Sequence, residues 1–342
     1  MARNRSGGMK AKQPGNPGSR GAQTSPPAAI HASPDGLTLP AVPSAIHVTH
    51  LMHLNTHTFI VAAAAFIAAC NLSLNAAPIP DEFKQNGFAI GCQAYSFNRF
   101  SVMEAIEKTA EAGGKVIEFF PGQRLTPDEP KVKPMVVLNH SSSDEVIAKV
   151  QAKLKQHGIK AVNYGVVGGK DEAEWRKIFE FAKKLDLYGI TTEDATKLDI
   201  IEPLVKEFDI RVGIHEHGRR PKNPEYRVWD PHYIMEVTKG RDLRIGACAD
   251  TGHWQTSGLS PVYCLRVLKG RIISAHLKDK TDYGEGQHDV PYGNGVGEIK
   301  RCLDELKKQG FEGNISVEYE YNWDHSVPEV KQCIDFVKSH GK

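Results

Sequence analysis

The sequence predicts an α/β fold of the (β/α)8 barrel class, in which eight parallel strands each lead into a helix. From about residue 85 onward, short runs rich in β-branched residues alternate with longer amphipathic segments. This alternation is typical of a parallel sheet covered by helices. Eight repeats in roughly 257 residues match the size of a closed barrel. The alternative is a doubly wound open sheet, but no glycine-rich phosphate-binding turn follows the first strand.

The expected strands are short and are separated by longer segments with a helical pattern of apolar residues. The strands are expected at 88–96, 115–120, 160–167, 188–193, 211–217, 244–250, 272–278 and 315–321. Helical patterns include 101–114, 142–158, 171–186, 260–270, 296–310 and 327–341. Several of them end in glycine, the residue that most readily adopts the left-handed conformation found at helix C-termini.

The N-terminal part of the chain differs in composition from the expected barrel, which we place at 86–342. Residues 1–51 are rich in Pro, Ser, Gly and Ala and show no helical or strand period, so we predict that they are disordered. The apolar run at 58–70 is too short to span a bilayer, which requires about 20 residues. It fits the hydrophobic region of a signal peptide covering 52–77, with small residues following where a peptidase could cut.

A signal peptide has consequences for the start and the location of the protein. If Met52 is the start codon, residues 1–51 are not translated. The sequence Ile67-Ala68-Ala69-Cys70 is similar to a bacterial lipobox, in which Cys70 would carry a lipid; otherwise it belongs to an ordinary signal. We therefore expect an exported protein, periplasmic or lipid-anchored, without a transmembrane span.

Composition argues against two classes of protein. The formal net charge is +2, and a nucleic-acid-binding protein would need a clustered basic face. Five cysteines follow Cys70 without any CxxC pair. An odd number cannot form a closed disulfide framework, and Cys92 and Cys248 lie in apolar strands, so we expect buried free thiols there.

Polar residues gather at the C-terminal ends of the expected strands. They are Gln93, Tyr95, Glu118, Asn163, Glu193, His215, Glu216, His217, Asp250, His276, Lys278, Glu318 and Glu320. In (β/α)8 barrels the chemistry lies at this rim. Converging imidazole and carboxylate groups suit a divalent transition metal such as Zn²⁺, Mn²⁺ or Co²⁺, although hydrogen-bonded core residues or a structural ion-pair network would show the same pattern.

Side-chain alternation decides which part of "HEH" (215–217) faces the barrel mouth. Residues two apart share one face of a strand, so His215 and His217 point one way and Glu216 the other. Because Val212 and Ile214 are needed outward against helices, the histidines are the inward pair. We expect Glu216 to form a second-shell or surface bond.

Three short motifs resemble a known family. "DTGHW" (250–254), "SAHLKD" (274–279) and "ISVEYEYN" (315–322) are similar to segments of the sugar phosphate isomerase/epimerase family, the xylose-isomerase-like TIM barrels, and the resemblance covers about 87–342. It implies that Asp250, His276 and Glu318 are metal ligands and that His253 binds substrate. The implied cofactor is a divalent ion: Mn²⁺, Co²⁺, Zn²⁺ or Mg²⁺.

The fifth expected strand departs from the family pattern. Epimerases of the family carry a glutamate there that is both ligand and base, and here the corresponding residue is His215, which would be the fourth ligand. Glu216 faces the wrong way, whereas Glu193 could substitute from one side. A similar histidine-rich strand occurs in relatives such as inosose dehydratase.

The resemblance implies proton abstraction next to a carbonyl through a metal-stabilised enediolate. Glu318 or Glu320 would be the base, with Glu193 acting from the opposite side. The residues expected to bind substrate are Tyr95, His217, His253, Lys278 and His288. The first hypothesis is an isomerase or epimerase of a free sugar or keto-sugar. The partner would be a small carbohydrate and not a nucleic acid, and the protein could be a homodimer, as family barrels often pair.

Other functions stay open. A lyase or dehydratase acting on a 3-keto-glycoside or an inosose would use the same metal site. A non-catalytic sugar-binding barrel would keep Tyr95, Trp254 and Trp323 as stacking platforms. Apurinic endonucleases share the barrel but need three metals and a basic groove, for which this sequence lacks ligands and charge. The long glycine-rich segment 276–299 is either a surface loop or a flap that brings His288 and Asp289 near substrate.

Overall fold

The computed structural model describes residues 77–132 and 134–342. The expected N-terminal extension at 1–51, the expected signal peptide apart from Ala77, and Cys70 therefore lie outside the described residues. Within the described part of the chain, no helix combines the length and the apolar character needed to cross a membrane.

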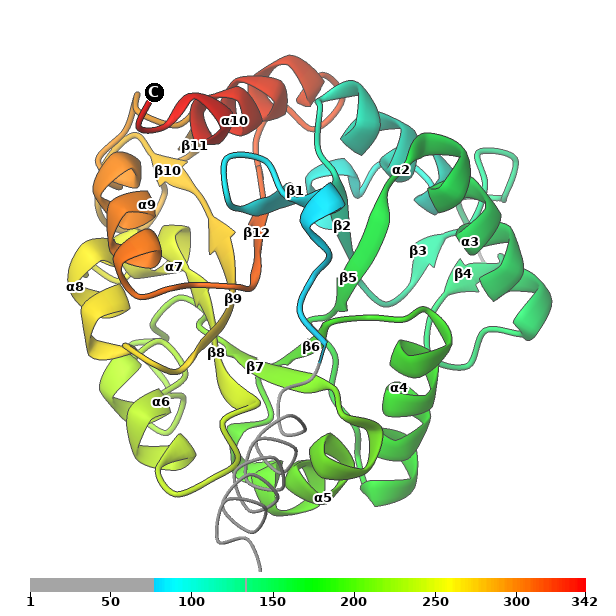
Figure 1. The fold of residues 1–342 in the computed structure, drawn as a ribbon, viewed down its shortest axis with the longest axis horizontal. Coiled ribbons are helices and arrows are strands. Elements are labelled where there is room, and N and C mark those ends of the chain that lie inside the picture. Colours follow the sequence, from blue (N-terminus) through cyan, green and yellow to red (C-terminus); the bar gives the residue numbers. More distant parts are fainter. Residues whose placement is uncertain (1–76, 133) are drawn as a thin grey trace, which may run out of the picture. The chain divides into compact units, whose positions relative to one another are not determined.

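Eight parallel strands close into a barrel, as the sequence predicts (Figure 1). They are β1 (Ala89–Gln93), β2 (Val116–Phe119), β5 (Lys160–Tyr164), β6 (Gly189–Thr192), β7 (Arg211–His215), β8 (Ile245–Asp250), β9 (Ile272–Leu277) and β12 (Asn314–Val317). The strands pair in sequence order, and β12 pairs with β1 to complete the ring. All eight expected strands are present, most of them shorter than expected at the C-terminal end because the polar rim residues leave the ladder.

The helices form an outer ring around the strands (Figure 1). They are α2 (Val102–Glu111), α3 (Asp144–His157), α4 (Glu172–Lys184), α5 (Leu198–Phe208), α6 (Pro231–Thr238), α7 (Thr251–Thr256), α8 (Pro261–Val267), α9 (Ile299–Lys308) and α10 (Val327–Ser339), with short 3-10 helices at Asp81–Phe83, Ala94–Phe97 and Ala195–Lys197. The six segments with a helical pattern are confirmed. Gly158 ends α3 in the left-handed conformation.

Side-chain caps start several of these helices. Ser101 and Glu104 form a capping box at the start of α2, in which each side chain accepts a hydrogen bond from the other residue's backbone N–H. At the start of α7, Asp250 Oδ1 accepts a hydrogen bond from His253 N at 2.8 Å. Asp250 therefore ends a strand and begins a helix, and the cap fixes one of its two carboxylate oxygens.

The core lies mainly between the strands and the helix ring. Val212 and Ile214 of β7 belong to this apolar cluster, as the alternation in the sequence predicts. A smaller apolar cluster fills the N-terminal end of the barrel interior, where Ile79 packs with residues of four strands and is only 1% exposed. The five cysteines of the described chain are free and buried, which confirms the expectation for Cys92 and Cys248.

A chain of polar contacts crosses the middle of the barrel. Asn163 donates a hydrogen bond to Asn314 (2.9 Å), and Asn314 donates one to the Ser316 hydroxyl (2.8 Å). The Ser316 hydroxyl in turn donates to Glu118 Oε2 at 3.0 Å. The interior is thus apolar at one end and increasingly polar toward the C-terminal ends of the strands.

The glycine-rich segment after β9 is an ordered structure. Its two short strands, β10 (Asp279–Lys280) and β11 (Asp289–Val290), pair antiparallel. A second two-stranded sheet, β3 (Gln123–Arg124) and β4 (Val137–Leu138), follows β2. The buried carboxylate of Asp279 accepts backbone hydrogen bonds from three glycines, Gly293, Gly295 and Gly297, at 2.8–3.1 Å. One side chain therefore holds residues 293–297 beside β10.

Replacing Asp279 by alanine is expected to release this segment. The loss of three hydrogen bonds to a buried charged group should lower the free energy of unfolding by at least about 3 kcal/mol. Hydrogen exchange measured by mass spectrometry should rise across 281–297. The exposed neighbour Asp282 offers the control: Asp282→Ala should leave both readouts unchanged, and equal protection in both variants would contradict the role given to Asp279.

Candidate metal centre

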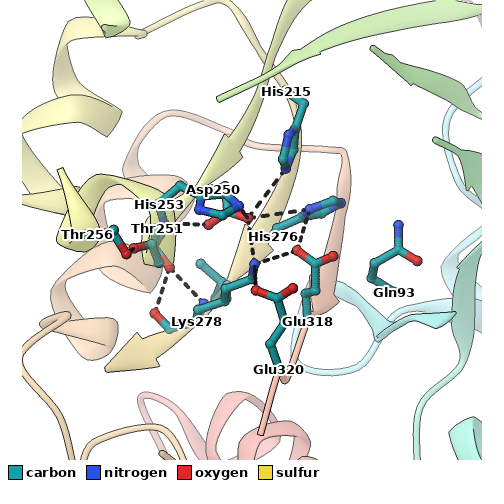
Figure 2. A network of polar contacts seen from close by, with 12 residues as sticks. Gln93, His215, Asp250, Thr251, His253, Thr256, His276, Lys278, Glu318 and Glu320 are labelled. Atoms are coloured by element: carbon teal, nitrogen blue, oxygen red, sulfur yellow. Dashed lines mark hydrogen bonds and ion pairs between the residues drawn. The ribbon is translucent and has the colours of Figure 1, made fainter. Parts of the chain in front are cut away.

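Four side chains from neighbouring strands meet at the C-terminal rim of the barrel (Figure 2). His215 ends β7, Asp250 ends β8, His276 lies near the end of β9, and Glu318 directly follows β12. One nitrogen or oxygen atom of each residue lies within 4.8 Å of the others, and all four residues are buried. The structure therefore brings together the four residues that the sequence predicts as metal ligands.

The donor atoms of this cluster fit a divalent ion. Both ring nitrogens of His215, together with Asp250 Oδ2, His276 Nδ1 and Glu318 Oε2, are buried without a hydrogen-bond partner. Buried polar atoms are normally paired, so a set of unpaired atoms facing one point suggests that an ion binds there. Two imidazoles and two carboxylates are a donor set that Zn²⁺, Mn²⁺ or Co²⁺ accepts. The cluster could hold such an ion.

Glu118 orients one of the histidines from below. His276 Nε2 lies 2.9 Å from Glu118 Oε2, and Glu118 also accepts hydrogen bonds from the hydroxyls of Thr191 and Ser316. Because the carboxylate binds the protonated Nε2, the Nδ1 atom of His276 faces Glu318 Oε2 (3.2 Å) and Asp250 Oδ2 (3.7 Å). Carboxylates of this kind fix the orientation of histidine ligands in metal sites.

Lys278 introduces a buried positive charge beside the cluster (Figure 2). Its side chain is fully buried, and Nζ lies 3.2 Å from Asp250 Oδ2, 2.7 Å from Glu318 Oε2 and 3.0 Å from Glu320 Oε2. Burial disfavours the ammonium, but the charges of these carboxylates outweigh it and raise the pKa of Lys278 well above its ordinary value. Lys278 is thus a permanent cation of the site.

Glu193 lies beside Nδ1 of His215, whereas Asp250 lies beside Nε2 of the same ring. His215 Nδ1 is 3.6 Å from Glu193 Oε1, and the Tyr226 hydroxyl donates a hydrogen bond to Glu193 Oε2 at 2.7 Å. Burial acts to raise the pKa of Glu193, but the contacts with His215 and Tyr226 outweigh it and lower the pKa to about 2. At neutral pH, Glu193 is therefore a weaker proton acceptor than an ordinary glutamate.

A cavity of about 320 Å³ opens above the cluster. It is lined by Gln93, Tyr95, Phe120, Pro121, Gly165, Val166, Glu193, His215, His217, His253, Glu318 and Glu320. Carboxylates and imidazoles form one side of this wall, and aromatic and aliphatic groups form another. Such a combination is typical of sites that bind small polar ligands.

Two histidines of the cavity wall are neutral. The rings of His217 and His253 lie 4.1 Å apart. Burial lowers the pKa of both side chains, and the nearby positive charges of His215 and Lys278 lower it further. Each neutral ring offers both a donor and an acceptor, which suits contacts with hydroxyl groups.

The residues predicted to bind substrate do not all lie in the cavity wall. Tyr95, His217 and His253 line it, and Lys278 lies just beneath it. His288 instead stacks on Tyr321, with ring centroids 4.3 Å apart, and it is not among the described cavity-lining residues; its role stays a prediction. Trp254 is wholly buried in α7, so the expectation that it offers a stacking platform is wrong.

The expectation for Glu216 is also wrong. It is fully buried, and neither carboxylate oxygen has a hydrogen-bond partner, so the predicted second-shell or surface bond is absent. Burial, together with neighbouring acidic groups, raises the pKa of Glu216 well above its ordinary value. The side chain points away from the cavity toward Cys264 of α8, in the layer between barrel and helices. Strand alternation alone cannot distinguish this buried layer from a wet surface.

Glu118 and Tyr226 take part in the site in ways that the sequence did not predict. An acid inside the apolar strand β2 was a signal for Glu118, because buried carboxylates are rarely unpaired. No comparable signal marked Tyr226, which lies 11 residues beyond His215 in an irregular segment.

Comparison with known proteins agrees with this geometry. Residues 195–340 match the family model described as xylose isomerase-like TIM barrel. A putative uncharacterized protein of Parabacteroides distasonis is 32% identical, with a TM-score of 0.58, and the alignment covers 74% of this chain and 98% of that one. The chain belongs to the xylose isomerase-like TIM barrel family. The predicted resemblance is therefore confirmed.

More distant structures share the fold. D-allulose 3-epimerase from Methylomonas sp., in complex with D-allulose, is 14% identical over 78% of this chain and 100% of its own, with a TM-score of 0.57. A xylose isomerase domain protein from Planctomyces limnophilus is 14% identical over 68% and 90%, with a TM-score of 0.52. No curated protein matches the chain significantly.

Removing the unpaired acid at 216 is expected to stabilise the protein. Glu216→Met keeps a side chain of similar length but leaves no buried oxygen without a partner, so the free energy of unfolding at pH 7 should rise by about 1–3 kcal/mol. Denaturant unfolding measures the change. Glu285→Met, at an exposed loop position, is the control; a Glu216→Met protein less stable than the wild type would show that the carboxyl has a partner in solution.

Proposed function

We propose that the protein is a metal-dependent isomerase or epimerase that acts on a free sugar or keto-sugar. The observation that carries the proposal is the buried cluster of His215, Asp250, His276 and Glu318, whose unpaired donor atoms lie directly below the cavity. The D-allulose complex of a protein with the same fold supports a carbohydrate as the ligand. These four residues would hold the divalent ion, which supplies a positive charge that stabilises negative charge developing on substrate oxygens.

The cavity offers one carboxylate suited to remove a proton next to a carbonyl. Glu320 lines the cavity and is not one of the four proposed ligands. The Lys278 ammonium lowers the pKa of Glu320, but burial and the charges of Glu318 and Asp289 together raise it above its ordinary value. A carboxylate with a higher pKa is a stronger base. We assign the proton acceptor to Glu320 in preference to Glu318.

The remaining wall residues would orient the sugar. His217 and His253 are neutral and can bind hydroxyl groups, while Tyr95 and Phe120 offer apolar faces for the carbon skeleton. Glu193 faces the site from the far side. Epimerisation would require Glu193 in its protonated form, which would pass its proton to the opposite face of the carbon and be left as the carboxylate that accepts the Tyr226 hydrogen bond at 2.7 Å.

A lyase or dehydratase is the second candidate, and one observation favours it. Where epimerases of the family carry a glutamate on the fifth strand, this chain has His215, and its nearest acid on that side, Glu193, has a pKa of about 2. Because Glu193 holds no proton at neutral pH, return of a proton from that side is disfavoured, and expulsion of a β-substituent competes with it. The substrate would then be a 3-keto-glycoside or an inosose.

We also propose export to the periplasm or a lipid anchor, from the sequence of 52–77 alone.

Metal reconstitution and two substrate classes test these proposals. The chelator-treated protein is loaded in turn with Mn²⁺, Co²⁺, Zn²⁺ and Mg²⁺ and incubated with free hexoses and ketohexoses, and separately with a 3-keto-glucoside. We expect an epimer or isomer by NMR and no activity without metal. Formation of an enone absorbance would select the lyase, and the absence of reaction with both classes would contradict both candidates.

Substitution of the proposed base should affect turnover more than binding. Glu320→Gln is expected to lower kcat by about 100-fold or more with little change in KM, because the side chain keeps its size but cannot accept the proton. Glu312→Gln, at an exposed position near the opposite end of the barrel, is the control. A Glu320→Gln enzyme with wild-type kcat would remove Glu320 from the mechanism.

The contact between Glu118 and His276 gives a separate prediction for metal binding. Glu118→Gln should weaken Mn²⁺ binding by about 10- to 100-fold, because the amide holds the imidazole less firmly than the carboxylate. Isothermal titration calorimetry measures this without a substrate. Glu305→Gln changes another buried acid, which pairs with Arg266 on the helix ring, and should bind Mn²⁺ as the wild type does.

A further inference from the structure

Lys278 contacts the same carboxylates that would bind the metal. Its ammonium lies 3.2 Å from Asp250 Oδ2 and 2.7 Å from Glu318 Oε2, and Figure 2 shows it between the two side chains. Both oxygens nevertheless have no hydrogen-bond partner among the described residues. The contact is therefore an ion pair without a directional hydrogen bond, and the same two oxygens are available to a competing cation.

The hydrogen bond of the ammonium goes to a different carboxylate. Lys278 Nζ donates to Glu320 Oε2 at 3.0 Å. Glu320 is held in turn by the glycine-rich segment, since its backbone N–H donates to Asp289 Oδ2 at 2.7 Å. The ammonium is therefore shared by Glu320, which accepts its hydrogen bond, and the two proposed ligands, with which it forms ion pairs.

The path of the Lys278 side chain is also built into the fold. Its backbone N–H and C=O are both bound by the Thr251 hydroxyl at 2.8 Å, and Gln255 donates a further hydrogen bond to the same C=O. The side chain then passes across Gly252, where an added Cβ would lie 2.5 Å from Lys278 Cδ. Any residue other than glycine at 252 would push the lysine out of this path.

Electrostatics gives this arrangement two consequences. The carboxylates of Asp250, Glu318 and Glu320 are close together and buried, so they repel one another unless a cation lies among them, and Lys278 supplies that cation. A divalent ion at the cluster would be repelled by the same ammonium, because both positive charges face the same oxygens at low effective dielectric. One residue therefore stabilises the assembled site and opposes the metal.

We propose that Lys278 is a resident counter-ion of the metal centre: it keeps Asp250 and Glu318 in place without a metal, and it weakens the binding of divalent ions. Glu320 moderates the second effect, because it shares the positive charge of the ammonium with the two ligands. The inference rests on the proposed function, since it takes His215, Asp250, His276 and Glu318 as the metal ligands.

Removal of the ammonium tests both effects in the full-length protein. Lys278→Met should bind Mn²⁺ at least about tenfold more tightly than the wild type in isothermal titration calorimetry, because the charge repulsion is gone. In chelator its Tm should be lower than that of the wild type, and Mn²⁺ should raise its Tm by more. Equal or weaker Mn²⁺ binding by a folded Lys278→Met protein would overturn the proposal.

Lys280→Met is the matched control. Lys280 is also buried, lies on the same segment two residues away, and pairs with Asp289 at 2.8 Å, but none of its described contacts is with a proposed ligand. Its loss should lower the Tm and leave the affinity for Mn²⁺ unchanged. Equally tighter Mn²⁺ binding by both variants would mean that any loss of a buried positive charge strengthens binding, whatever its position. That result would overturn the proposal.

A double-mutant cycle separates the effect of Glu320 on the Lys278 ammonium from the simple loss of the Glu320 charge. Its Glu320→Gln arm also gives a result if Lys278→Met does not fold without metal. Glu320→Gln should weaken Mn²⁺ binding in the wild type, and this loss should be much smaller when Lys278 is also methionine. Equal losses in the two backgrounds would overturn the role of Glu320.

Folding of Lys278→Met only in the presence of Mn²⁺ would support the counter-ion role. If Mn²⁺ does not restore its fold, the Glu320→Gln variant decides. An Mn²⁺ affinity of Glu320→Gln equal to that of the wild type would then overturn the proposal. The wild type also separates this inference from the proposed function. Failure of the wild type and of Lys278→Met to bind any divalent ion would overturn both. Normal metal binding that is insensitive to Lys278 would overturn the inference alone.

Discussion

The register between β8 and β9 is the constraint on which the site depends. Asp250 lies directly opposite His276 in the parallel ladder, after an irregularity between Ala247 and Cys248 shifts the pairing. In a strand, a shift of one residue moves every side chain to the other face. Without this register, His276 would point into the helix layer and Asp250 would lose the imidazole that lies 3.7 Å from its Oδ2. The rim is specific because the barrel closes and each strand can pair in only one way.

Hydrogen bonds in the barrel interior below the rim hold the polar residues of the site in position. Hydrogen bonds run from Asn163 through Asn314 and Ser316 to Glu118, which in turn binds His276. Each step satisfies a buried group that would otherwise destabilise the core. The same chain fixes the tautomer of the histidine. Structural stability and the orientation of a proposed ligand thus depend on one set of contacts.

The strands and the polar rim could be predicted because both follow local rules: alternation along a strand, and the position of polar residues where strands end. The family resemblance then selected the four proposed ligands from this rim. Glu216 and Trp254 were misjudged because their surroundings come from helices distant in sequence, and a face turned away from the cavity can be either buried or wet. Lys278 was expected to bind substrate, a role that remains a prediction, and its contacts with three carboxylates follow from register and from the space left by Gly252. Tyr226 reaches Glu193 only through the path of an irregular segment, for which no periodic pattern exists.

The apolar base of the barrel limits how far the chain can be shortened by proteolysis. Ile79 closes the N-terminal end of the interior and packs with Ala89, Val116, Val162 and Ile273. Trimming that removed it would open the base of the barrel to water. A peptidase acting in the small-residue stretch that ends at Ala77 would cut before Ile79 and leave this closure intact. If the expected signal peptide is removed there, the cleavage site must lie on the N-terminal side of Ile79 for the barrel to stay closed.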